Sequence, residues 1–241
     1  MPIANYRVSI AALLSFAAAA FAQESPTPTA TPSPSPMPTA TPTPARSVRI
    51  SFLPPPLEGR ISLGIYDARG KLVRVLHREA EVDEFTVGAD ALVTKWDGKN
   101  DQGEDLPRGK YRAHGFLVGR LNVEHLGTAN TPPTDDPTTV QVKLIANPLE
   151  GDTRKTIDVA VGLDTNSSFI KTSDGLPLTS ISVNPGDAPQ AFNTTVKRVL
   201  MTKSGDSAVD VWEDSGDSVD QAHISNIQQM MAFDCGEIEL K

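Results

Sequence analysis

The chain is poor in cysteine and aromatic residues, and both shortages restrict what it can do. Among its 241 residues Cys235 is the only cysteine, so no intramolecular disulfide can form. We interpret Cys235 as a small buried residue of a terminal strand, because no histidine near it in the sequence would activate it as a nucleophile. The chain has 2 Trp and 3 Tyr, few for the exposed aromatic platforms of carbohydrate-binding proteins. Trp212 is the one candidate for an exposed aromatic residue that could bind a sugar, because Tyr66, Trp96 and Tyr111 lie in strand contexts that predict core packing.

Clusters of lysine or arginine are also missing. The formal net charge is -8, and an acidic chain without a basic patch repels phosphate backbones, which argues against nucleic acid as a partner. There is no phosphate-binding glycine loop either, and we expect no cofactor. The acidic residues lie in turns such as Asp135-Asp136 and residues 214–220, a pattern typical of solvated surface turns.

Residues 1–22 have the pattern of a cleavable secretory signal peptide. Arg7 supplies the positive charge, residues 8–21 are an apolar run, and Ala20-Phe21-Ala22 predicts cleavage before Gln23. The run is shorter than the roughly 20 apolar residues that span a bilayer, and no later segment is apolar enough. No cysteine follows it, which argues against a lipid anchor. We therefore expect a secreted, periplasmic or cell-envelope protein with no transmembrane segment after cleavage.

Residues 23–46 consist almost entirely of proline, threonine, serine and alanine. Prolines occupy near-alternating positions from Pro26 to Pro44. Because proline fixes φ and lacks an amide donor, we expect a disordered linker in extended polyproline II conformation, about 3 Å long per residue. The composition is also that of O-glycosylated stalks. Such a linker predicts a folded module displayed at a distance from its attachment point.

The segment 47–118 predicts a small Ig-like β-sandwich. Its apolar residues alternate, as in Ile61, Leu63 and Ile65, and tight turns such as residues 67–70 separate the runs. No helical period is present, and the short strands have the spacing of Ig-like folds. Trp96 is predicted to anchor the core, and the Asp and Gly residues around it to form turns.

Three ordered blocks in this segment match a known family. They are Ile65-Tyr66-Asp67-Ala68-Arg69-Gly70-Lys71-Leu72-Val73-Arg74-Val75-Leu76, Trp96-Asp97-Gly98-Lys99-Asn100-Asp101-Gln102-Gly103 and Leu106-Pro107-Arg108-Gly109-Lys110-Tyr111. The segment from Val48 to Val118 resembles the FlgD Ig-like family, which is named for the flagellar hook-capping protein. The resemblance implies a non-catalytic structural or interaction role, and it carries over no catalytic residue. The assembly region of the hook cap has no counterpart here, so a flagellar role is not expected.

After a connector at 119–139, residues 140–241 predict a second β-rich domain. Its expected strands are Val140 to Ile145, Thr156 to Leu163, Ser168 to Thr172, Leu178 to Val183, Val196 to Thr202, Ser207 to Trp212, Ala222 to Ile227 and Met230 to Asp234. Apolar positions recur at a spacing of about 40 residues, as propeller blades do. In this possible internal repeat, the positions of Val159, Val161, Phe169 and Ile181 correspond to those of Val199, Met201, Val209 and Ile224. Two blades cannot close a ring, so we favour a meander or sandwich over a partial propeller.

Two acidic segments are candidate metal sites. The alternating positions of a calcium loop are occupied here by Asp97, Lys99, Asp101, Gly103 and Asp105, so a lysine stands at one ligand position, and no glutamate occupies the twelfth. We expect a polar turn there, with a weak calcium site as the alternative. The loop with Asp214, Asp217 and Asp220 is expected to be a solvated turn.

Catalytic patterns are weak. His77, His114, His125 and His223 have no zinc-binding spacing, and no Gly-x-Ser-x-Gly elbow is present. Glu237 and Glu239 share one face of a terminal strand, where they protect an edge from aggregation.

The sequence thus predicts an exported, non-enzymatic structural or binding module on a flexible tether, with an unknown protein, cell-wall or glycan partner. The alternatives are a carbohydrate-binding protein or hydrolase-like enzyme with its site in residues 140–241, and a truncated propeller relative without independent activity. A pocket that joins a carboxylate to His223 would favour the enzyme.

Overall fold

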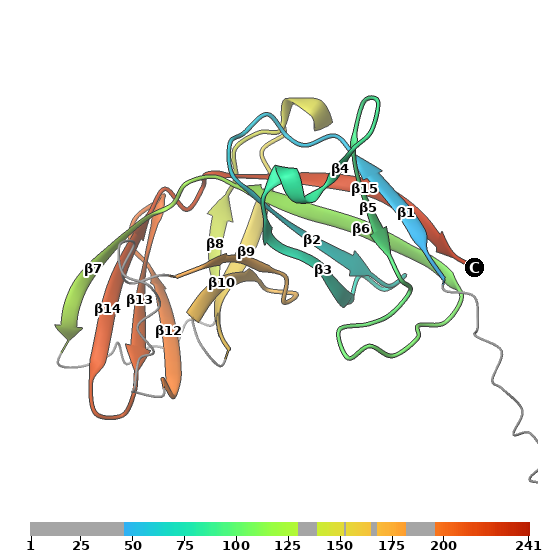
Figure 1. Ribbon diagram of the computed structural model, residues 1–241. Coiled ribbons are helices and arrows are strands. Elements are labelled where there is room, and N and C mark those ends of the chain that lie inside the picture. The colour runs from blue at the N-terminus through green and yellow to red at the C-terminus, as the bar shows by residue number, and fades with distance from the viewer. Residues whose placement is uncertain (1–45, 130–138, 152, 165–167, 182–195) are drawn as a thin grey trace, which may run out of the picture. The chain divides into compact units, whose positions relative to one another are not determined.

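The computed structural model describes residues 46–129, 139–151, 153–164, 168–181 and 196–241 (Figure 1). Within these ranges the chain forms β-strands and two short 3-10 helices, η1 (Val82–Glu84) and η2 (Pro148–Glu150), which confirms the predicted all-β class. No helix in the described ranges is long and apolar enough to cross a membrane. The predicted signal peptide (1–22) and, apart from Arg46, the predicted linker (23–46) lie outside the described residues.

The first sandwich packs a three-stranded antiparallel sheet against a four-stranded one. The smaller sheet has the order β1-β5-β4, with β1 at Val48–Phe52, β5 at Leu92–Trp96 and β4 at Thr86–Val87. The larger sheet has the order β15-β6-β2-β3, with β15 at Met230–Leu240, β6 at Gly109–Val118, β2 at Arg60–Tyr66 and β3 at Leu72–Ala80. Each pairing is antiparallel.

Aromatic side chains fill the space between these two sheets. The Phe52 ring stacks on Phe233 with 4.8 Å between centroids. Trp96 is fully buried, its ring meets Tyr111 edge-on at 5.0 Å, and its Nε1 donates to the carbonyl of Lys99 at 2.9 Å. The buried indole thus has a polar partner, and the prediction that Trp96 anchors the core is confirmed.

Strand pairing crosses the predicted domain boundaries. β15, from the end of the chain, runs along β6 from the Met230–Val118 pair to the Leu240–Gly109 pair (Figure 1). The predicted connector 119–139 contains a further strand, β7 (Asn122–Ala129), which pairs with β14 (Val219–Ser225). Alternation in a sequence indicates which face of a strand is buried but does not identify its partner, so these long-range pairings were not predicted.

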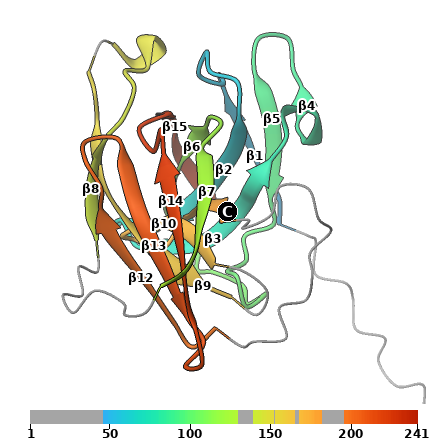
Figure 2. The ribbon, with the colours of Figure 1, turned by 90° about the vertical axis from the view of Figure 1, so that its left-hand side faces the viewer.

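A second pair of sheets is formed by the remaining strands and β7. One sheet has the order β11-β10-β9-β8, with β11 at Pro177–Ser180, β10 at Ser168–Thr172, β9 at Thr156–Leu163 and β8 at Val140–Lys143. The other has the order β12-β13-β14-β7, with β12 at Arg198–Lys203 and β13 at Ala208–Asp214, and its strands stand in a row in Figure 2.

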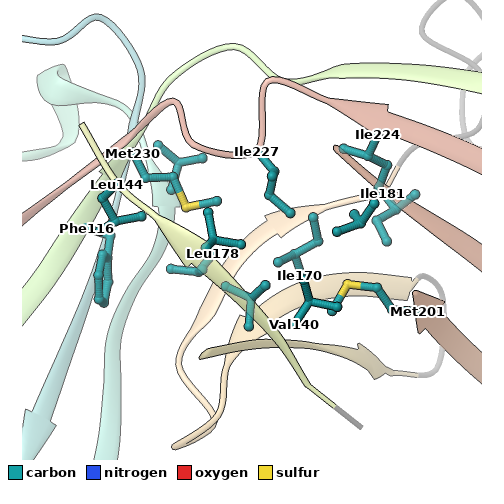
Figure 3. Close-up of a cluster of buried hydrophobic side chains, with 14 of the residues drawn as sticks. Phe116, Val140, Leu144, Ile170, Leu178, Ile181, Met201, Ile224, Ile227 and Met230 are labelled. Atoms are coloured by element: carbon teal, nitrogen blue, oxygen red, sulfur yellow. The ribbon is translucent and has the colours of Figure 1, made fainter. Parts of the chain in front are cut away.

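These two sheets share one core (Figure 3). Ile170 from β10, Met201 from β12 and Ile224 from β14 are all buried in it. The recurring apolar positions therefore belong to the inner faces of two facing sheets, whereas propeller blades are arranged radially. Phe169 does not belong to this core; its ring lies 4.6 Å from the guanidinium carbon of Arg78.

The larger sheet of the first sandwich is buried on both faces. Ile61, Leu63 and Ile65 pack into the first core, as the sequence predicted. The intervening Ser62 is fully buried on the other face, where its hydroxyl donates to the carbonyl of Leu178 at 3.4 Å. Phe116 and Met230, from β6 and β15, join the second core. The β1-β5-β4 sheet and the second sandwich therefore cover opposite faces of the β15-β6-β2-β3 sheet.

Candidate functional site

The three predicted metal-site aspartates each have a separate partner. Asp97 Oδ1 accepts the backbone amide two residues further on, at 3.1 Å. Asp101 Oδ1 accepts the amide of Val75 at 2.9 Å, and Asp105 pairs with Arg46 at 3.2 Å. Only the Asp97 contact is the turn chemistry expected from the sequence, because Asp101 binds an amide of β3 and Asp105 binds an arginine that precedes β1. In the described part of the chain, no group of three or more His, Cys, Asp or Glu residues is placed to hold a metal ion.

The acidic loop after β13 is also built from local contacts. Asp214 Oδ1 accepts the amide of Gly216 at 2.7 Å, and the Ser215 hydroxyl donates to the carbonyl of Ser218 at 3.2 Å. Asp220 Oδ1 accepts the hydroxyl of Thr128 on β7 at 3.2 Å. Asp214 thus stabilises the turn, and Asp220 stabilises the contact with the neighbouring strand. Asp217 is exposed.

Trp212 and His223 share one face of the β12-β13-β14-β7 sheet. His223 stands opposite Asp210, and its Nδ1 lies 2.7 Å from Asp210 Oδ1. Trp212 follows two residues after Asp210, whereas Val211 between them points into the core. Sequence reasoning missed Asp210, because its contact with His223 depends on the register of two strands. Trp212, His223 and Asp210 line neither of the two clefts described below.

The remaining candidates differ in their surroundings. Burial, together with the charges of Asp234 and Glu150, raises the pKa of the Cys235 thiol to about 12, so the thiol stays protonated and is a poor nucleophile at neutral pH. Glu237 pairs with Lys110 of the neighbouring strand at 2.8 Å, and Glu239 is exposed.

The larger cleft, of about 850 Å³, is bordered by the edge strands β7 and β11. Its lining includes the apolar residues Val123 and Ile181 together with acids and arginines. Arg60 Nε pairs with Glu81 at 2.8 Å. Glu79, which has a left-handed φ of 49°, accepts the hydroxyls of two β11 residues. Both carboxylates are therefore paired with other residues of the cleft lining.

The smaller cleft, of about 640 Å³, lies beside edge strand β8. Lys143 from β8, Arg154 from the segment before β9 and Lys203 from β12 line it together. The single carboxylate in the lining, that of Asp206, lies 3.4 Å from Lys203 Nζ. Gln228 adds a side-chain oxygen that is buried and has no hydrogen-bond partner among the described residues.

The sequence contained only a faint signal for this second cleft. Its cations come from three separate segments, so the sequence contains no cluster of basic residues that would indicate the cleft. Val140 and Val142 alternate with Gln141 and Lys143, which places the polar pair on the outer face of the strand, but only the fold brings Arg154 and Lys203 beside it.

None of the protein-family models, curated proteins or solved structures compared with the chain matches it.

Proposed function

We propose that the chain is an exported, non-enzymatic binding module, secreted or held at the bacterial cell envelope on a flexible linker. The signal-peptide pattern of residues 1–22 and the proline-rich composition of 23–46 support export and display. The resemblance of residues 48–118 to the FlgD Ig-like family supports an interaction role.

The observation that carries the binding role is the cation-lined cleft beside β8. Its lining combines Lys143, Arg154 and Lys203 with side-chain amides and hydroxyls, and it contains neither a histidine nor a pair of carboxylates. General acid–base catalysis most often uses histidine or carboxylates within hydrogen-bond reach of a substrate. The composition of this cleft therefore favours binding over catalysis.

A hydrolase-like enzyme is the second candidate, and the Asp210–His223 pair is the observation that favours it. A carboxylate that orients an imidazole is part of a catalytic triad. A triad also needs a nucleophile hydrogen-bonded to the other ring nitrogen, and no described hydroxyl bonds to His223 Nε2. Neither Asp210 nor His223 lines either cleft.

Export can be tested by expressing the full chain with a C-terminal tag in a bacterial host. We expect the protein outside the cytoplasm, with a mature N-terminus at Gln23 by intact mass. Ala22→Asp should block cleavage, because signal peptidase requires a small residue before the cut, whereas Ala19→Ser is the matched control that should be processed. Unprocessed wild-type protein in the cytoplasm would contradict the proposal.

A further inference from the structure

We propose that the cleft beside β8 binds an anionic saccharide, a sugar chain that bears carboxylate or sulfate groups. This inference rests on the proposed binding role and names its ligand class. It is argued from the charge of the cleft, from the hydrogen-bonding groups in its lining and from the residue types that the lining lacks.

The charge of the cleft is opposite to that of the chain. The whole sequence has a net charge of -8, yet three cations and one carboxylate line this hollow. Lys143 and Arg154 have no ion-pair partner among the described residues, and Lys203 makes one ion pair, with Asp206, whose side chain is fully exposed. Cations gathered in a concave site concentrate the field on a bound anion.

The hydrogen-bonding groups fit sugar hydroxyls. Gln141, Gln229, Thr156 and Ser207 can each donate and accept. A sugar hydroxyl likewise donates and accepts, so it can pair with each of these groups, whereas an ionised carboxylate or sulfate can only accept.

The edge of β8 adds two backbone groups to the same cleft. The backbone amide of Leu144 donates to the backbone carbonyl of Lys155, next to β9, at 2.9 Å. In an antiparallel pair such bonds alternate, so the amides of Gln141 and Lys143 point away from β9, toward the open edge. A strand of four residues offers only this short row, which favours a saccharide over an added peptide strand.

The absence of aromatic residues from the lining separates anionic from neutral sugars. None of the residues that line the cleft is Trp, Tyr or Phe, and Trp212 lies elsewhere, on the outer face of β13. Binding must therefore depend on charge and hydrogen bonds instead of stacking on aromatic rings, and it should weaken as salt screens the cations.

The test is calorimetric titration of the mature chain (residues 23–241) with polygalacturonate and chondroitin sulfate, alongside neutral dextran and polyglutamate. We expect saturable binding of an acidic glycan, much weaker binding of polyglutamate, none of dextran, and a loss of affinity between about 0.05 M and about 0.5 M salt. Lys143→Ala with Arg154→Ala should weaken binding about tenfold. The matched control, Lys95→Ala with Arg108→Ala, removes the same charge from exposed positions of the first sandwich and should bind like wild type.

Gln141→Leu provides a readout that does not change the charge. It should lower affinity without lowering the thermal midpoint, because Gln141 lines the cleft and its side chain is exposed on the outer face of β8. Binding to no acidic glycan, equal binding to dextran or polyglutamate, or equal loss in both double variants would overturn the inference. An exported, processed protein that binds none of these glycans would leave the module role standing and refute only the ligand class.

Discussion

Two histidines show how the fold changes the chemistry of single residues. The ring of His114 on β6 stacks on Tyr66 at 3.8 Å, where the two sandwiches meet. Burial lowers the pKa of His114, and the nearby Asp174 carboxylate partly opposes this. Burial also lowers the pKa of His77, whose Nε2 lies 2.7 Å from the Thr94 hydroxyl. Both imidazoles therefore stay neutral in the folded protein at pH values where they are protonated in the unfolded chain.

This difference predicts a loss of stability in mild acid. Below the ordinary histidine pKa the unfolded chain binds more protons than the folded one, so the free energy of unfolding falls as the pH decreases. The thermal midpoint measured from about pH 7.5 to about pH 5 should fall less steeply in His114→Gln than in wild type. Gln102→Asn, at an exposed position without a titratable group, should keep the wild-type slope. Parallel curves for all three proteins would refute the assignment.

At the scale of elements, the sequence predicted strands best where both alternation and turns are regular. β9 and β10 have the predicted bounds, Thr156–Leu163 and Ser168–Thr172. The strand predicted to end at Asp234 continues to Leu240, because a bulge at Cys235 shifts the register and interrupts the alternation. β7 was missed because most of its side chains are exposed, as befits an edge strand, so its apolar pattern is weak.

The candidate functional residues were less predictable than the strands. Trp212 and His223 were identified by residue type, but Asp210 beside His223 follows only from the pairing of β13 with β14. The cations of the smaller cleft come from positions 143, 154 and 203. Their proximity depends on how two sheets pack, and short-range patterns contain no information about that.

The close approach of β2 and β6 gives a test at this scale. A Cβ at Gly115 would lie 2.3 Å from the carbonyl oxygen of Ser62, so Gly115→Ala should cost about 3 kcal/mol or more in denaturant unfolding. At Gly64 the closest atoms belong to the Leu72 and Tyr66 side chains, which can move, so Gly64→Ala should cost about 1 kcal/mol. Equal losses would show that the backbone contact is looser than described.

At the scale of the whole molecule, β15 and its sheet connect the two sandwiches. Met230 and Ala232 pack into the second core, and Phe233, Ile238 and Leu240 into the first. Arg78 on β3 pairs with Asp164 at 2.9 Å, and Glu79 binds hydroxyls of β11. Because the β1-β5-β4 sheet and the second sandwich bury opposite faces of the β15-β6-β2-β3 sheet, the described residues of both sandwiches should unfold together. The module that presents the basic cleft is then a single body.

The most direct test of this central claim uses the two tryptophans, one in each sandwich. Trp212→Phe leaves Trp96 to report on the first sandwich, and Trp96→Phe leaves Trp212 to report on the second. In each variant, urea unfolding is followed by tryptophan fluorescence and by far-ultraviolet circular dichroism. We predict that the two signals give the same midpoint and slope within each variant. A fluorescence transition separated from the dichroism transition in either variant would show that the sandwiches unfold independently and would contradict the account.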